Sequence, residues 1–389
     1  MMAVFQHRKV LVGFGLIVIA SLAAMFVAPR PEVPHQSIPD GFTDSEFWNL
    51  VNEFSEPNGY FRSDNFVSNE SAFQRVIPGL KKRVQPGGVY VGVGPDQNFT
   101  YIVALRPKVA FVVDIRRQNM LLHLMYKALF EMSGNRAEFL SRLFARPVPP
   151  SLPESFTTEQ LFAAFANSVS EQDLAQSSLD DILDRLSRHG FDITPDDSKA
   201  IETVYNAFVS AGPEIRYSFP NQYAWRRFPS YAELMLETDG TGEQAGTNHS
   251  YMASEENFQA IKRLELENRV IPIVGDFAGE KALRAVGQYV AEHGATISTF
   301  YTSNVEFYLF QTEDWRKFLH TVSLLPIHAD SVFIRSYFNN YNLQFVNPPS
   351  WLDTTPQSYT LTDNMPAFVG AASAGRISNY FDVIRRSKP

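Results

Sequence analysis

Two glycines and an acid stand at the ends of two successive apolar runs. Gly92 and Gly94 close the run 89–93, and Asp114 closes the next run, 22 residues after Gly92. Glycines at a strand end let the backbone turn sharply and approach a ligand, and a following helix offers free N–H groups to polar atoms. A carboxylate at the end of the next strand can accept hydrogen bonds from both ribose hydroxyls of an adenosine. The spacing therefore predicts a nucleotide-type ligand, with an ordinary strand-to-helix turn and a solvated acid as the alternative.

The residues of the turn narrow the class of ligand. The dinucleotide fingerprint G-x-G-x-x-G is incomplete, because Gln97 stands where the third glycine belongs. NAD and FAD are therefore disfavoured, whereas a glycine pair with a strand-end acid is typical of enzymes that use S-adenosylmethionine. Asp96 could bind an amino group of that cofactor, and Asn98 and Arg116 complete the candidate cofactor-binding residues of this part of the chain.

Two later runs also end in polar residues. Asp276 follows the apolar run 270–274 and is a further candidate for cofactor binding; the alternative is a helix N-cap. Tyr301, Asn304 and Glu306 lie at the end of the expected strand 296–301 and are candidates for substrate contact. Here the alternative is a capping box in the stretch SNVE at 303–306, in which Asn304 and Glu306 only begin a helix.

Composition excludes several other chemistries. The chain has no cysteine, which removes disulfides, thiol nucleophiles and cysteine-bound metals. Its eight histidines show no H-E-x-x-H spacing, and the G-x-S-x-G and P-loop motifs are missing, so we expect no metal. A net charge of −8 and a pI near 5.6 argue against nucleic-acid binding, for which a basic surface is expected. A small-molecule ligand is the expected partner.

The stretch 89–116 resembles the first two motifs of the class I S-adenosylmethionine-dependent methyltransferases. Gly92 and Gly94 match the glycine loop of that family, and Asp114 matches its ribose-binding acid. The stretch VGDF at 274–277 resembles the later strand-end acid motif, which in that family lies near the cofactor or the substrate. The resemblance implies a Rossmann-like domain that binds S-adenosylmethionine and transfers a methyl group to an unknown acceptor.

A longer resemblance covers about residues 71–336. This region is similar to an uncharacterised bacterial family with a methyltransferase-like domain, through the stretches VGPDQNFTYI, VDIRRQN, ELMLETDGTG, VGDFAGEKALRAV and FYTSNVEFYLF. That family carries no established activity, so this resemblance leaves open whether the chain is an enzyme.

The elements that must position these residues alternate between strand and helix patterns. Strands are expected at 89–93, 270–274, 296–301 and 331–335, and amphipathic helices between them predict an α/β, Rossmann-like, mainly parallel sheet with helices on both faces. We place this domain at 43–340, with a helical insertion at about 151–211. Residues 341–389 are expected to form an irregular C-terminal tail.

The N-terminus predicts a membrane segment. After a short segment at 1–9, residues 10–28 are apolar and uncharged, long enough for a single-pass transmembrane helix, and a proline-rich linker follows at 29–42. A cleaved signal peptide is the alternative. Arg8 and Lys9 precede the apolar run, and this charge bias favours a body outside the cytoplasm.

That orientation conflicts with the cofactor, because S-adenosylmethionine is not expected outside the cytoplasm. Two hypotheses therefore remain open: a membrane-anchored methyltransferase-like enzyme, or a non-catalytic Rossmann-like binding or scaffolding protein of the cell envelope. A third is an enzyme that acts on another small nucleotide or sugar ligand, with the glycine-rich loop 238–246 as its lid.

Overall fold

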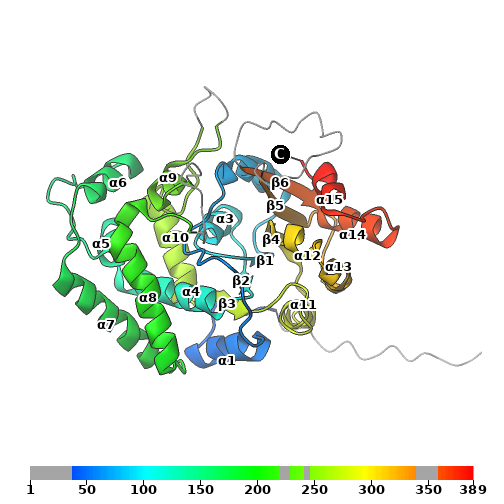
Figure 1. Ribbon diagram of the computed structural model, residues 1–389, viewed down its shortest axis with the longest axis horizontal. Coiled ribbons are helices and arrows are strands. Elements are labelled where there is room, and N and C mark those ends of the chain that lie inside the picture. The colour runs from blue at the N-terminus through cyan, green and yellow to red at the C-terminus, as the bar shows by residue number, and fades with distance from the viewer. Residues whose placement is uncertain (1–36, 219–227, 241–245, 339–357, 389) are drawn as a thin grey trace, which may run out of the picture. The chain divides into compact units, whose positions relative to one another are not determined.

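The computed structural model describes residues 37–218, 228–240, 246–338 and 358–388. In these residues the apolar runs form one six-stranded sheet with the strand order β3-β2-β1-β4-β5-β6 (Figure 1). The strands are β1 (Val89–Gly92), β2 (Val109–Asp114), β3 (Val270–Val274), β4 (Ile297–Ser303), β5 (Val332–Phe338) and β6 (Ser358–Asn364). The first five are parallel, and β6 is antiparallel to β5.

The strand order confirms a mixed α/β fold with a mostly parallel sheet. The chain runs outward from β1 through β2 to β3, then returns to the other side of β1 with β4. This is the order of Rossmann-type sheets, in which the reversal between β1 and β4 is the topological switch point. Both β2, inside the sheet, and β3, at its edge, have apolar side chains on both faces, and all their residues are buried, as expected for parallel strands that helices cover.

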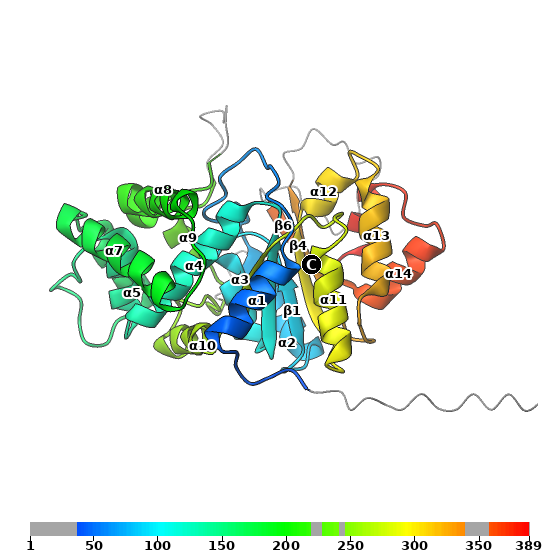
Figure 2. The ribbon, with the colours of Figure 1, turned by 90° about the horizontal axis from the view of Figure 1, so that it is seen from below.

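Helices cover both faces of the sheet. The helices are α1 (Asp44–Phe54), α2 (Ile77–Arg83), α3 (Gln97–Leu105), α4 (Arg117–Met132), α5 (Arg136–Phe144), α6 (Thr158–Ala166), α7 (Gln172–Arg188), α8 (Pro195–Ala211), α9 (Tyr231–Leu236), α10 (Glu255–Leu266), α11 (Ala282–Glu292), α12 (Val305–Leu309), α13 (Asp314–Leu324), α14 (Met365–Ser373) and α15 (Tyr380–Arg386), with short 3₁₀ turns η1 (Phe73–Val76) and η2 (Gly212–Glu214). Contacts join α3, α4 and α10 on one face, and α1, α11, α13 and α14 on the other (Figure 2).

The helical block lies between β2 and β3. The insertion predicted at 151–211 contains α6, α7 and α8, and it packs on α4 and α5. Capping boxes at Thr157 and Thr194 begin α6 and α8, because each threonine accepts the N3 amide while the N3 side chain returns to the threonine N–H. The stretch 117–144 is divided into α4 and α5 at Ser133–Asn135, where Ser133 caps the end of α4 and Asn135 caps the start of α5.

The C-terminal region differs from the prediction of an irregular tail. Residues 358–364 form β6, which pairs with β5 from Val332↔Asn364 to Phe338↔Ser358. The stretch SYTLTDN places Tyr359 and Leu361 on one face among polar residues, so its strand signal is weak without its partner. The helices α14 and α15 follow, and Lys388 makes an isolated bridge with Thr362. The described residues after 357 therefore belong to the α/β domain.

Between η2 and β3 the described residues add no strand to the sheet, and Arg216 makes only an isolated bridge with Ser230.

The apolar run 10–28, predicted to be a membrane anchor, lies outside the described residues, as do residues 241–245 of the glycine-rich loop. Within the described ranges, none of the helices combines the length and the apolar character that crossing a membrane requires.

Candidate ligand-binding site

A cavity of about 310 Å³ opens at the carboxyl ends of β1, β2, β3 and β4. Its walls come from the loops that follow these four strands and from the segment 60–70, which connects α1 to η1. Open α/β sheets bind ligands at this edge, outside the switch point between β1 and β4. The volume is also at the lower end of the range found for small-molecule pockets.

Gly94 gives the cavity an open stretch of backbone. Its φ is 79°, a left-handed conformation that glycine adopts without steric cost. Around the position that a Cβ would occupy, the only atom within 4 Å in the described residues is Asn65 Nδ2, at 3.6 Å. A ligand can therefore approach the backbone of the turn closely at this residue.

Gly92 and Asn98 have a different role, inside the turn. A Cβ on Gly92 would collide with Asn98 Oδ1 and with the Tyr90 ring, so this glycine is required by packing. Asn98 is fully buried, and its Oδ1 accepts a hydrogen bond from the Tyr90 hydroxyl at 2.9 Å. Its Nδ2 donates to the carbonyls of residues 93, 94 and 95, at 3.0, 3.2 and 2.7 Å. Neither residue lines the cavity; both fix the shape of the glycine turn.

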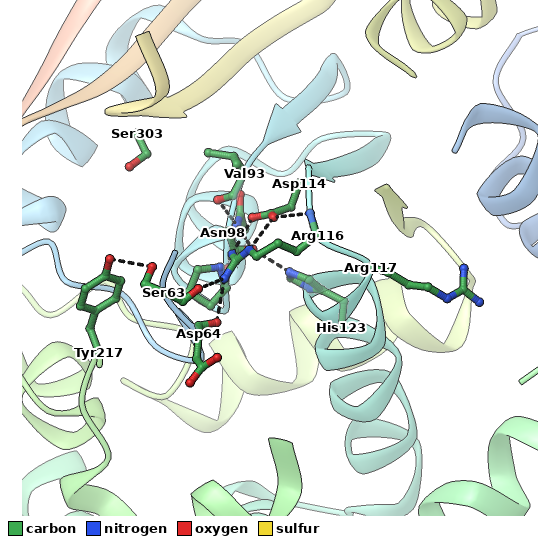
Figure 3. Close-up of polar contacts among 12 residues, drawn as sticks. Ser63, Asp64, Val93, Asn98, Asp114, Arg116, Arg117, His123, Tyr217 and Ser303 are labelled. Atoms are coloured by element: carbon green, nitrogen blue, oxygen red, sulfur yellow. Dashed lines mark hydrogen bonds and ion pairs between the residues drawn. The ribbon is translucent and has the colours of Figure 1, made fainter. Parts of the chain in front are cut away.

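Asp114 lines the cavity as half of a buried ion pair (Figure 3). Arg116 Nε donates to Asp114 Oδ1 and Arg116 Nη2 donates to Oδ2, both at 3.0 Å, and the Arg116 amide adds a third bond to Oδ1. The other guanidinium nitrogen donates to the carbonyls of Ser63 and Asp64. The solvated-acid alternative is therefore wrong for Asp114, which is 4% exposed.

His123 stabilises the glycine turn through a hydrogen bond to its backbone. It is buried on α4, and its Nε2 lies 2.9 Å from the carbonyl oxygen of Gly94. Because a carbonyl only accepts, Nε2 carries the proton. Burial lowers the pKa of His123 to about 4, so the ring is neutral near pH 7. The neutral imidazole thus holds the carbonyl of the residue that faces the cavity.

Asp96 points away from the cavity and into the helical layer. It is 1% exposed, and its Oδ2 accepts a hydrogen bond from the Tyr251 hydroxyl at 3.1 Å. The Tyr251 hydroxyl lies 2.6 Å from that of Tyr231. Burial raises the pKa of Asp96 to about 7. Asp96 is therefore a core acid in this structure, and it does not line the candidate site.

The end of β3 brings Asp276 to the cavity wall. Its Oδ1 accepts the Ala278 amide at 2.9 Å, which closes a tight turn, and α11 begins only at Ala282. The N-cap alternative is thus not realised. Glu56, which follows α1, accepts the amides of Asp276, Lys281 and Ala282 instead. No motif around Glu56 predicted this role, because its three partners lie more than 200 residues later in the chain.

The end of β4 is distorted where it meets the cavity. The β4–β5 register is irregular between Tyr301 and Ser303, and Ser303 has a φ of 52° although it is not a glycine. Both residues line the cavity, together with Asn304. The Ser303 hydroxyl donates to the carboxylate of Glu70. Bulges and left-handed backbone of this kind re-aim side chains and are enriched at functional sites.

Glu306 is in a separate, structural ion pair. Its carboxylate accepts from Arg335 Nε at 2.5 Å and from Arg335 Nη2 at 3.1 Å, and both residues are almost completely buried. The predicted capping box is missing, because Ser303 bonds to Glu70 and α12 has no side-chain cap. Glu306 is not among the cavity-lining residues.

The cavity therefore unites only part of the predicted set. It brings together six candidates from four strand ends, namely Gly94, Asp114, Arg116, Asp276, Tyr301 and Asn304, and leaves four elsewhere, namely Gly92, Asp96, Asn98 and Glu306. Glu70 was missed, since it lies in a polar, turn-rich stretch without a recognisable motif. Across the described residues no group of three His, Asp or Glu side chains could hold a metal ion.

Comparison with known proteins gives one substantial match. A family model described as "Domain of unknown function (DUF7790)" matches residues 65–150 and 195–365, more than half of the chain. The gap in the match falls on α6 and α7, within the helical block. No curated protein matches the chain.

Among solved structures, an rRNA methyltransferase, aviRa from Streptomyces viridochromogenes, aligns with 85% of this chain and 95% of its own. The identity is 11% and the TM-score is 0.31. A likeness at this level supports no inference about activity, so function must be argued from the cavity itself.

Proposed function

The chain belongs to the DUF7790 family, a domain of unknown function, and we propose that it is a methyltransferase-like enzyme that binds S-adenosylmethionine in the cavity at the ends of β1 to β4. One observation carries the proposal. Gly94 follows β1 and Asp114 ends the neighbouring parallel strand β2, in register from Val89↔Val109 to Gly92↔Val112, and both line the same cavity. An adenosine in this cavity would contact the accessible backbone of Gly94 on one side and the carboxylate of Asp114 on the other.

The residues present fit the adenosine part of such a ligand. Asp114 Oδ1 accepts two hydrogen bonds, but Oδ2 accepts one, from Arg116 Nη2, which leaves Oδ2 a lone pair for a ribose hydroxyl. The open backbone at Gly94 gives the ligand room. The two hydrogen bonds from the Arg116 guanidinium hold the Asp114 carboxyl group in one orientation at the cavity wall.

S-Adenosylmethionine, when bound, supplies an electrophilic methyl group. The chain's own residues would bind and orient: Asp114 and Gly94 hold the nucleoside, Asp276 lies beside them, and Tyr301 and Asn304 line the end of the cavity formed by β4. Residues 60 and 61 add aromatic rings to the wall, which reduces the access of water to the ligand.

Calorimetric titration of the full chain with S-adenosylmethionine and S-adenosylhomocysteine tests this function. We expect saturable binding and a weakening of roughly 10- to 100-fold in Asp114→Asn, because a charge-assisted hydrogen bond is worth about 1.5–3 kcal/mol. Asp64→Asn is the matched control, since Asp64 is exposed and does not line the cavity. No heat and no thermal shift at millimolar ligand would rule out the proposal.

A non-catalytic binding module is the second candidate, and the Asp114–Arg116 ion pair favours it. A carboxylate that already accepts three hydrogen bonds is a weaker ribose ligand than a free one. Binding of S-adenosylmethionine without loss of its methyl group, in the presence of candidate acceptors, would support this module.

We also propose, from the sequence of residues 10–28, that the chain is tethered to a membrane. A reporter fused to the C-terminus, scored for periplasmic against cytoplasmic activity, assigns the side of the α/β domain. A periplasmic domain would favour the binding module over the enzyme.

A further inference from the structure

We propose that the cavity selects a ligand with a cationic nitrogen, which it holds between the carboxylate of Glu70 and a set of aromatic rings. The inference rests on the proposed function only in taking the same cavity as the ligand site. It adds the chemical class of the group that binds at the end formed by β4 and by the segment 60–70.

Glu70 is fixed in place at this end of the cavity. Its Oε2 accepts Gln97 Nε2 at 2.8 Å, and its Oε1 accepts the Ser303 hydroxyl. Its own amide donates to Ser68 Oγ at 3.1 Å, and the Ser68 hydroxyl in turn donates to Gln97. Three elements thus converge on one carboxylate that is 1% exposed and still lines the cavity. A side chain held this way is pre-organised for a ligand.

The charge of the cavity is unbalanced around Glu70. Four carboxylates line it, and Arg116 is the only cation among the described lining residues. Arg116 is committed to Asp114, and Asp314 pairs with Lys317 on the surface. No cation of the described residues lies within ion-pair distance of Glu70. A buried carboxylate without a countercharge is costly, and a ligand cation would supply the missing charge.

The rest of the wall suits a cation with apolar substituents. Five rings line the cavity, from Tyr60, Phe61, Phe277, Tyr301 and Tyr308. Ammonium groups with alkyl substituents bind to the faces of such rings. Two of the rings already bind cations: Arg116 lies over Phe61 at 5.8 Å, and the exposed Arg62 lies over Tyr308 at 5.7 Å.

Tyr60 marks the mouth of this aromatic wall. It is 83% exposed, an unusual position for a large ring, and it lines the cavity. Because Tyr60 contributes little buried surface, it can be replaced without harm to the core. It therefore separates ligand binding from folding in an experiment.

Tyramine and tyrosol, which share a phenol ring and differ in an ammonium or a hydroxyl group, test the inference by ligand-observed NMR on the full chain. We expect tyramine to bind at least about tenfold more tightly than tyrosol, and Glu70→Gln to abolish this preference. Glu313→Gln, an exposed acid near the rim, should retain it. Equal binding of the two probes to the unmodified chain would overturn the inference, as would an undiminished preference in a folded Glu70→Gln variant.

If Glu70→Gln does not fold, Tyr60→Ala replaces it. Several-fold weaker tyramine binding in Tyr60→Ala supports the aromatic part of the proposal, and unchanged binding contradicts it.

The Glu70→Gln variant also shows whether the cationic nitrogen belongs to the nucleoside ligand or to a separate ligand. Weaker binding of S-adenosylhomocysteine but not of 5′-methylthioadenosine, in Glu70→Gln, would assign the ammonium to the nucleoside ligand itself. Tyramine selectivity without any nucleoside binding would support this inference and refute the proposed cofactor.

Discussion

Replacing Asp96 with asparagine should remove a large part of the pH dependence of folding. Asp96 follows the glycine turn, yet its carboxyl is buried and its Oδ1 has no partner among the described residues. Burial raises its pKa from 3.8 to about 7. Between these two values the folded chain binds a proton that the unfolded chain does not, so the free energy of unfolding falls as the pH rises.

The size of the effect follows from the pKa difference. Each pH unit between the folded and unfolded pKa values is worth about 1.4 kcal/mol. Between pH 5 and pH 8 the Asp96 carboxyl passes from protonated to ionised in the folded state, which costs on the order of 2.5 kcal/mol of stability. Asparagine cannot ionise, so Asp96→Asn should lose this difference. An unpartnered amide changes stability equally at both pH values and cancels in the comparison.

Urea unfolding of both proteins at pH 5 and pH 8, followed by far-UV circular dichroism, measures the effect. The unmodified chain should lose about 2.5 kcal/mol more than Asp96→Asn over this interval. Asp330→Asn, which removes an exposed carboxylate, should behave like the unmodified chain. If Asp96→Asn shows the same pH dependence as its parent, Asp96 is ionised in the fold and the reasoning from its burial is wrong.

Three further predictions concern ion pairs. Arg116→Ala leaves the buried Asp114 without its partner and should lower the free energy of unfolding by about 3–5 kcal/mol in urea, with partial recovery in the double variant Arg116→Ala/Asp114→Asn. Glu306→Ala should cost a similar amount, about 3–5 kcal/mol, by leaving Arg335 buried, and Glu306→Gln should leave tyramine and nucleoside titrations unchanged if Glu306 is only structural. Hydrogen bonds to Glu131 and Asp44 raise the pKa of His189, so its contribution to stability is complete below pH 6.5 and is lost as the pH rises through its folded pKa. In His189→Gln the free energy of unfolding should therefore depend less on pH above pH 6.5. An unchanged dependence would contradict this assignment.

The sheet was largely predictable because its strands β1, β2 and β3 have unusually clear sequence signals. The runs VYVG, VAFVVD and VIPIV are continuous apolar stretches bounded by glycine, proline or acid, and each became a buried parallel strand. The strand β6 was not predictable, because most of its residues are polar and it depends on pairing with β5, whose partner residues lie at least 20 positions away. Local sequence does not encode such a pairing.

The site was predictable only where backbone geometry determines it. Gly94 and Asp114 were found because a turn and a strand end place them at one edge of the sheet. Asp96 and Glu306 have equally suggestive positions in the sequence, but their orientation depends on tertiary partners, Tyr251 and Arg335. Glu70 was missed because its importance comes entirely from residues distant in sequence.

The position of β1 in the middle of the sheet has a consequence for how the chain acquires its fold during synthesis. Val89 pairs on one side with Val109, which leaves the ribosome soon afterwards, and on the other with Ile297, roughly 200 residues later. Until then β1 and β2 form an apolar pair with one open edge each, since β3 also lies beyond the helical block. Such edges invite association with other chains. Soluble expression should therefore depend on chaperones that protect nascent chains and should improve when translation is fast relative to aggregation.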